Sequence, residues 1–274
     1  GFPRLEEPPG TNGIPPSISS DMEQQFIPGI YNYCDRWCER CSLTHRCRVY
    51  AGETDMTVEQ QDITKEAFWQ YLSDSLQQAL DYLQAHMEEM GIDWEAMKEE
   101  ALSEGEVGRE ALSPDQEALQ CIAEKYYDEA KQWFENHQQL FQEREAHLRR
   151  QLDMGLEVMP EAHRLGDALE IINWYSFFIS GKLRRALSGL NDKWMWEDFP
   201  VQNDANGSAK VVLLSVERSL AAWEVVRGAF PEVADELLDI LVLLGKLRQG
   251  IRSLFPEVDR FIRPGFDEPD HQAE

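Results

Sequence analysis

Apolar side chains recur every three or four residues over most of the chain after residue 57. The first such stripe consists of Phe68, Leu72, Leu76, Leu80, Leu83, Met87 and Met90. This spacing places its members on one face of a helix, and Gly91 ends the pattern. The two-residue alternation typical of strands is essentially absent, so the pattern predicts an all-α protein.

Later segments predict the other helices of an antiparallel bundle. Ser113-Pro114-Asp115-Gln116 is a strong helix start, because Ser caps, Pro occupies the first helical position and Gln reaches back. Over 161–190 apolar and aromatic residues lie on several faces, which indicates a central helix. The expected helices are 57–91, 93–102, 113–153, 161–190, 209–228 and 231–252, with 103–112 as a loop and 203–208 as a turn.

Composition along the chain divides it into four parts. Residues 1–20 are rich in Pro and Gly and predict an extended or disordered arm. A cysteine-bearing module follows over 21–56, then the bundle over 57–263 and an irregular tail over 264–274.

Four of the five cysteines stand close together, at Cys34, Cys38, Cys41 and Cys47. Their gaps of three, two and five residues let all four thiols converge on one point, which favours a metal site. A [4Fe–4S] cluster is commonly held by four thiolates from such short-spaced runs. Structural zinc is the alternative, although it usually pairs two Cys-x-x-Cys knuckles across a longer insert. Unligated thiols or disulfides are the third interpretation, and Cys121 is expected to be a small buried apolar residue.

The residues around these cysteines suit a shielded site. Aromatic side chains can exclude water, and arginines can offset thiolate charge and donate to sulfur. The arginines can equally form ion pairs with the acidic helices behind the module. The flanking residues are Tyr31, Tyr33, Trp37 and Tyr50, with Arg36, Arg40, Arg46 and Arg48.

A second site in the bundle has weaker support. The Glu-x-x-His pattern of carboxylate-bridged di-iron proteins does not occur in the sequence. The candidate acid–base residues on or near apolar faces are His137, Glu170, Glu217 and Asp239. The candidate pocket residues are Trp174, Tyr175 and Phe178. Structural ion pairs explain the three carboxylates among these acid–base candidates equally well. A core histidine whose ring nitrogens have hydrogen-bond partners explains His137 equally well.

The net charge of −25 limits the classes of partner. Residues 51–160 alone carry 26 acidic and eight basic side chains. Such a surface repels phosphate backbones, so we expect no nucleic-acid binding. No apolar run is long enough for a membrane span, and no signal peptide is evident. We therefore expect a cytoplasmic protein, in a compartment that keeps thiols reduced.

Three stretches carry a resemblance to known proteins: 27–41, which reads IPGIYNYCDRWCERC, 204–210, which reads DANGSAK, and 261–266, which reads FIRPGF. With them the chain resembles a group of bacterial proteins of unassigned function, which implies a bacterial source but no activity. The spacing of Cys34, Cys38 and Cys41 is also similar to that of radical S-adenosylmethionine enzymes. Those enzymes form α/β barrels, which the all-helical pattern does not predict.

Two functions follow from these observations. The first is a redox or electron-transfer protein with a [4Fe–4S] cluster beside a helical bundle, working with a redox partner. The second is a non-enzymatic interaction protein that zinc stabilises and that binds a basic partner through its acidic helices. The net charge alone also suggests an acidic mimic of nucleic acid.

Overall fold

The computed structural model describes residues 26–54, 56–89, 91, 93, 111–191, 196 and 198–268. All regular structure in these residues is helical, which confirms the all-α prediction. The predicted arm over 1–20 and the predicted helix over 93–102 lie outside the described residues, apart from Asp93. No described helix is long and apolar enough to cross a membrane.

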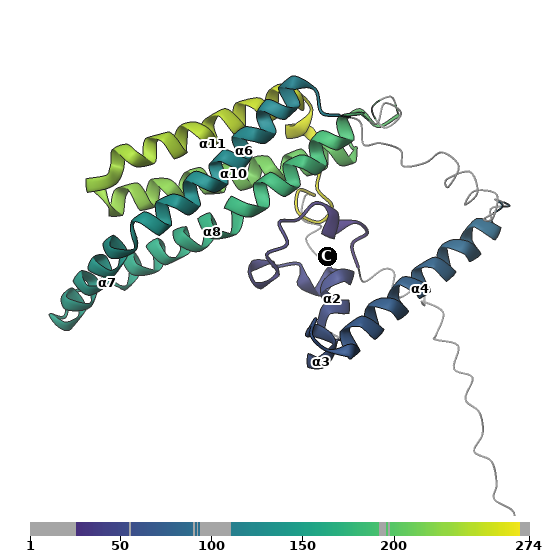
Figure 1. Cartoon of the computed structure of the whole chain (residues 1–274), viewed down its shortest axis with the longest axis horizontal. Helices are drawn as coiled ribbons and strands as arrows, with labels where there is room; N and C mark the ends of the chain where they lie inside the picture. Colours follow the sequence, from purple (N-terminus) through teal and green to yellow (C-terminus); the bar gives the residue numbers. More distant parts are fainter. Residues whose placement is uncertain are drawn as a thin grey trace, which may run out of the picture.

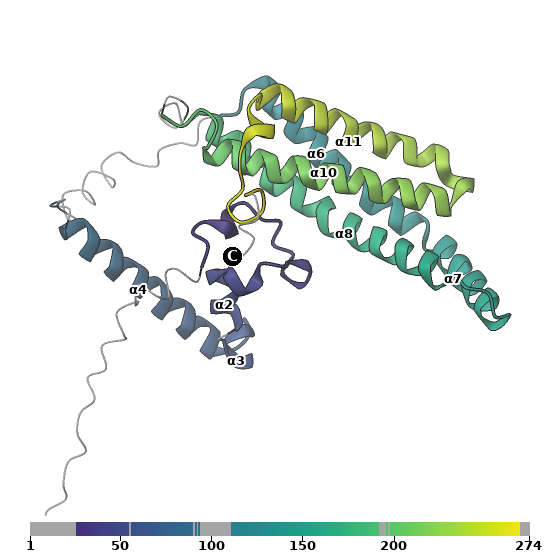
Figure 2. The same cartoon turned by 180° about the vertical axis from the view of Figure 1, so that it is seen from behind.

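Four helices form the body of the protein. They are α6 (Pro114–Asn136), α8 (Met159–Ser188), α10 (Asp204–Ala229) and α11 (Ala234–Leu254). Each packs against two others, in the ring order α6, α8, α10, α11 and back to α6. Successive helices run in opposite directions along the long axis (Figures 1 and 2). This is the up-and-down arrangement expected of helices joined by short connections.

The bundle interior is apolar and aromatic. Tyr126 of α6, Tyr175 of α8 and Trp223 of α10 are fully buried. The Trp223 indole N–H donates to the Tyr126 hydroxyl at 3.2 Å, so two polar atoms satisfy each other in the core. The sequence predicted 161–190 as the central helix, but α10 buries more of its residues than α8 does.

The predicted helix over 113–153 is interrupted at His137. Ser113 and Gln116 form the expected capping box, and α6 ends at Asn136. Helix α7 (Gln138–Asp153) then continues in nearly the same direction (Figure 1). His137 has φ −112° and ψ 20°, outside the helical range, and its Nδ1 lies 2.7 Å from the carbonyl oxygen of Trp133. The backbone N–H of His137 still donates to the same carbonyl, at 3.1 Å, so the interruption is a local change of backbone angles that periodicity does not detect.

The predicted turn over 203–208 is wrong, since α10 begins at Asp204. Asn203 is the N-cap, and its side-chain oxygen accepts from the backbone N–H of Asn206 at 2.8 Å. The Asn206 amide donates to the carbonyl oxygens of Pro200 and Val201. Asn206, Gly207 and Ser208 therefore lie near the start of the helix, and the Asn206 side chain bonds to the loop before it.

The predicted helix over 57–91 is divided as well. A capping box at Thr57 starts the short α3 (Val58–Gln61), and α4 (Glu66–Glu89) follows as a separate helix. The main packing partner of α4 is α3. At the other end of the chain, the predicted tail is described to residue 268, and residues 264–268 form turns.

Candidate metal centre

The cysteines lie in a module built from short turns. Its elements are η1 (Ile30–Asn32), η2 (Cys38–Arg40), η3 (Thr44–Arg46) and α2 (Arg48–Thr54). The backbone N–H of Cys41 bonds to the carbonyl of Cys38, and that of Cys47 bonds to the carbonyl of Thr44, both at 3.1 Å. These turns reverse the chain repeatedly, which keeps all four cysteines near one another.

All four cysteine side chains line one small pocket. Each is partly buried, and all four are free thiols rather than disulfide partners. The backbone N–H of Leu43 donates to Cys41 Sγ at 3.4 Å, and the Cys34 thiol donates to the carbonyl of Tyr31 at 3.6 Å. Backbone donors to sulfur are common around metal-bound thiolates. The donor set therefore fits a metal that prefers sulfur.

Among the described residues, no group of three or more His, Cys, Asp or Glu side chains is placed to hold one metal ion. Tetrahedral zinc needs four sulfurs at about 2.3 Å from one centre. In a cubane cluster each thiolate binds its own iron, so the four sulfurs stand farther apart.

Burial affects the acid–base chemistry of two ligand candidates. It raises the pKa of Cys34 and the pKa of Cys38, since a thiolate is poorly solvated there. Metal binding to these thiols therefore releases protons, and metal affinity is expected to increase with pH.

Aromatic and basic residues surround the pocket. Its wall includes Tyr31, Trp37 and Tyr50, as the sequence predicted, together with Phe266 from the far end of the chain. Arg36 also lines the pocket and has φ 58°, a left-handed conformation that is uncommon for residues other than glycine.

Asp35 anchors the module to the bundle. Its Oδ2 accepts from the hydroxyl of Tyr175 at 2.6 Å and from the guanidinium of Arg218 at 2.7 Å. Its backbone carbonyl accepts from the indole N–H of Trp174 at 3.0 Å. Burial is the main cause that raises the pKa of Tyr175 to about 12, so the phenol stays protonated and donates. Helices α8 and α10 together thus fix the residue next to Cys34.

Two of the predicted pocket residues of α8, Trp174 and Tyr175, contact this module. Trp174 stacks on Trp37 with ring centroids 5.1 Å apart, and Tyr175 meets the same indole edge-on at 6.0 Å. Phe178 packs on Tyr175 at 6.2 Å. Lys182, one turn further, donates to the carbonyl of Asn32 at 2.6 Å, and burial lowers its pKa to about 8. This face of α8 therefore packs against the cysteine module.

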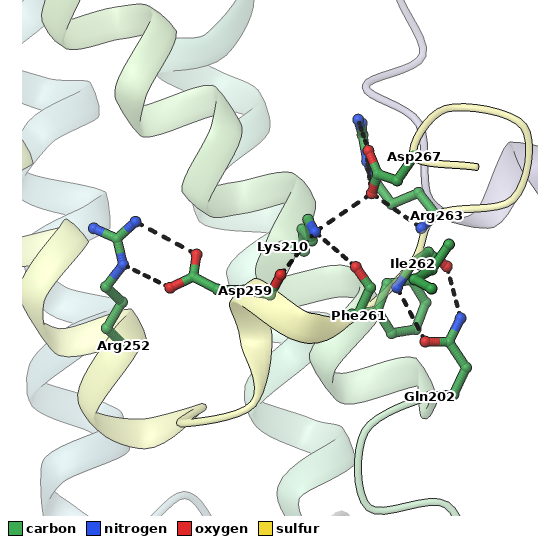
Figure 3. Close-up of polar contacts among 8 residues, drawn as sticks. All are labelled: Gln202, Lys210, Arg252, Asp259, Phe261, Ile262, Arg263 and Asp267. Atoms are coloured by element: carbon green, nitrogen blue, oxygen red, sulfur yellow. Dashed lines mark hydrogen bonds and ion pairs between the residues drawn. The ribbon is translucent and has the colours of Figure 1, made fainter. Parts of the chain in front are cut away.

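The C-terminal segment holds the other side of the module (Figure 3). Lys210 of α10 donates to the carbonyl oxygens of Asp259, at 3.1 Å, and Phe261, at 2.6 Å. Its ammonium also lies 3.4 Å from the carboxylate of Asp267, which Arg263 binds through several hydrogen bonds.

Gln202 adds to the contacts that Lys210 makes with the C-terminal segment, because it exchanges two hydrogen bonds with the backbone of Ile262 (Figure 3). Residues 258–267 are thereby tied to the start of α10, and they carry Phe266 to the cysteine pocket.

The stretches 27–41, 204–210 and 261–266 meet at this place. Tyr33 of the first packs on Phe261 of the third at 4.9 Å. A Cβ on Gly207, in the second, would lie only 2.4 Å from Tyr33 and 2.6 Å from Phe261. A Cβ on Gly265 would lie 2.6 Å from Ile27 Cδ1. The rings of Tyr33 and Phe261 leave no room for a side chain at Gly207, and the φ of 73° at Gly265 favours glycine there.

Comparison with protein-family models, curated proteins and solved structures gives no match. Evidence for the function of the module therefore comes from its own residues.

The predicted core histidine is held by local contacts. His137 stacks on Trp133 with ring centroids 4.7 Å apart, and its Nε2 lies 3.2 Å from a carboxylate oxygen of Glu236. It lies at the junction of α6 and α7, among aromatic residues of the bundle.

The predicted carboxylate candidates lie at the surface of the bundle. Glu170 pairs with Arg40 of the cysteine module at 2.5 Å, and Glu217 pairs with Arg252 at 3.2 Å. Asp239 is exposed on α11. The ion pairs give Glu170 and Glu217 structural roles, and Glu170 in particular helps hold the module.

Several residues of the site were missed by sequence reasoning. Phe266 was not predicted to act near the cysteines, and Asp35, Lys210 and Arg218 were expected only in structural ion pairs. The one signal in the sequence that pointed to Lys210 and Phe266 was their place in the stretches that carry the resemblance.

We predict that Arg218→Gln lowers the free energy of unfolding by about 1 kcal/mol, because it removes a partly exposed ion pair and leaves Asp35 with fewer donors. The matched control is Arg227→Gln, since Arg227 lies on the same helix and pairs only locally with Glu224 in the described structure. Urea unfolding of both variants measures the difference. Equal losses would contradict an anchoring role for Arg218.

Proposed function

We propose that the protein is a cytoplasmic, bacterial metalloprotein in which Cys34, Cys38, Cys41 and Cys47 hold a [4Fe–4S] cluster. The observation that carries the proposal is the convergence of four free, partly buried thiols on one pocket. Four thiolates are the ligand set of such clusters.

The surroundings support one-electron chemistry. A bound cluster would supply a reversible one-electron couple. Aromatic side chains would limit the access of water, and the backbone donor to Cys41 Sγ would stabilise the more negative, reduced state. We therefore propose electron transfer with a redox partner.

Structural zinc is kept as the alternative for a specific reason. Ile30 is the one fully buried side chain among described residues 26–54, so the module has almost no apolar core of its own. Small modules of this kind are commonly stabilised by a metal. Zinc bound by the same cysteines would serve as a folding element of an interaction protein.

Metal analysis of anaerobically purified protein distinguishes these functions. Our proposal predicts a brown protein with about four iron atoms per chain, broad absorption near 400 nm and bleaching by dithionite. A colourless protein that releases about one zinc ion per chain to a chelator would support the alternative. A protein with neither metal would contradict both.

A further inference from the structure

A second pocket lies between α6 and α8, at the end of the bundle where α6 begins and α8 ends (Figure 1). Its volume is about 870 Å³, which is within the range of small-molecule sites. The α6 residues that line it fall within about 100° of one helix face, so they form a single wall. The lining residues that matter here are Glu117, Gln120, Cys121 and Glu124 of α6, with Arg184 and Arg185 of α8.

The two walls of this pocket carry opposite charges. Glu117 and Glu124 stand on the α6 wall, and the two arginines stand on the α8 wall. Arg185 is bound on two sides by the carboxylate of Asp204, at 3.0 and 2.6 Å. Arg184 makes a single hydrogen bond, to Glu124 at 3.2 Å, and its side chain is 65% exposed. Because a guanidinium has five N–H donors, Arg184 can also bind the carboxylate of a ligand.

Two hydrogen-bond acceptors on the α6 wall have no donor. Glu117 is exposed and has no basic partner among the described residues. Gln120 is 4% exposed, and its amide nitrogen donates to Ser180 Oγ at 2.9 Å and to Glu124 at 3.0 Å. Its amide oxygen has no hydrogen-bond partner in the described part of the chain. A buried acceptor without a donor costs free energy, so Gln120 favours a ligand that brings an N–H group.

The distance between the charges sets the length of the ligand. Glu117 and Glu124 are seven residues apart on one helix, which is about 10 Å along its axis. Arg184 lies beside Glu124, so the ligand must reach from Glu117 over a similar distance to meet the guanidinium. Three residues of extended peptide span about 10 Å. The ends of such a peptide carry the charges that complement Glu117 and Arg184, and Gln120 lies between them along the helix.

We propose that this pocket binds a short peptide with free ends, of about three residues. The ammonium end pairs with Glu117, the carboxylate end pairs with Arg184, and a backbone N–H between them donates to Gln120 Oε1. A single amino acid is too short to reach both charges, and a simple cation or anion meets one of them alone. The inference goes beyond the proposed function and does not depend on the metal.

Binding of trialanine to the full-length protein tests the proposal. Calorimetry is expected to give a dissociation constant of about 1 mM, as for a small polar ligand in an open pocket. N-acetyl-trialanine has no ammonium group, and trialanine amide has no carboxylate. Each should therefore bind about fivefold more weakly than trialanine, since each loses one partly exposed ion pair.

Substitutions assign each end of the peptide to its wall. In Glu117→Gln, trialanine and N-acetyl-trialanine should bind equally, while trialanine amide still binds more weakly. In Arg184→Gln, trialanine and its amide should bind equally, while N-acetyl-trialanine still binds more weakly. The matched controls are Asp128→Asn on α6 and Arg164→Gln on α8, both exposed and outside the lining of the pocket. Both controls should keep the full difference among the three peptides.

Cys121 reports where the peptide binds, because its thiol is exposed and lines the same pocket. At about ten times the dissociation constant, trialanine should slow alkylation of Cys121 by iodoacetamide by up to about tenfold, as measured by mass spectrometry. Equal affinity for the free peptide and both blocked peptides would overturn the proposal, and so would an absence of binding at about 10 mM. Alkylation that trialanine does not slow would place the peptide elsewhere and would equally overturn it.

Discussion

Replacement of Cys38 by serine is expected to abolish stoichiometric metal binding. Cys38 is the second of the four thiols that line the pocket, and serine offers a weaker donor than thiolate to iron or zinc. We expect the metal retained after desalting and brief exposure to a chelator to fall at least about tenfold. Because the module has almost no apolar core, its resistance to proteolysis should fall as well.

The remaining cysteine provides the control for this experiment. Cys121 is exposed on α6 rather than buried as predicted, and it lies outside the residues that line the cysteine pocket. Cys121→Ala should leave both metal content and proteolysis unchanged. Full metal stoichiometry in Cys38→Ser would rule out ligation by four thiolates, and loss of metal in Cys121→Ala would mean that the ligand set is wrong.

The helical pattern could be predicted because it depends on local periodicity. The predicted helix over 113–153 covers both α6 and α7, and the capping box at Ser113 fixed the start of α6. Their division at His137 could not be predicted, since it is a change in the backbone angles of one residue and leaves the apolar spacing unchanged. The start of α10 was missed because Asn206, Gly207 and Ser208 are poor helix formers.

The cysteine cluster could be predicted for a related reason. Its four ligand candidates lie within 14 residues, and local spacing alone brings them together. The residues that fix the module in place are far apart in sequence. Asp35 meets Tyr175 across 140 residues and Arg218 across 183, and one sequence without homologues holds no information about such pairs.

The long-range contacts explain why residues at both ends of the chain belong to one site. The C-terminal segment is tied to α10 by Lys210 and reaches the cysteine pocket through Phe266. The module therefore depends on the bundle for its position, and a change at their junction should affect both stability and metal binding.

Gly207→Ala is expected to show this dependence most directly. The added methyl would lie within 2.6 Å of ring atoms of both Tyr33 and Phe261, which come from opposite ends of the chain. Tyr33 is part of the cysteine module, and the backbone of Phe261 is held by the hydrogen bond from Lys210. The overpacking should lower the free energy of unfolding by about 1–3 kcal/mol and accelerate metal release to a chelator.

The matched control lies on the same helix. A Cβ on Gly228 would have no neighbour within 4 Å among the described residues, so Gly228→Ala should stabilise the protein by up to about 1 kcal/mol through helix propensity alone. Urea unfolding and the rate of metal release measure both variants. If Gly207→Ala behaves like Gly228→Ala in both measurements, then Tyr33 and Phe261 move apart without cost. In that case the module does not depend on close contact with α10, and its position would have to be set by Asp35 and its partners on α8.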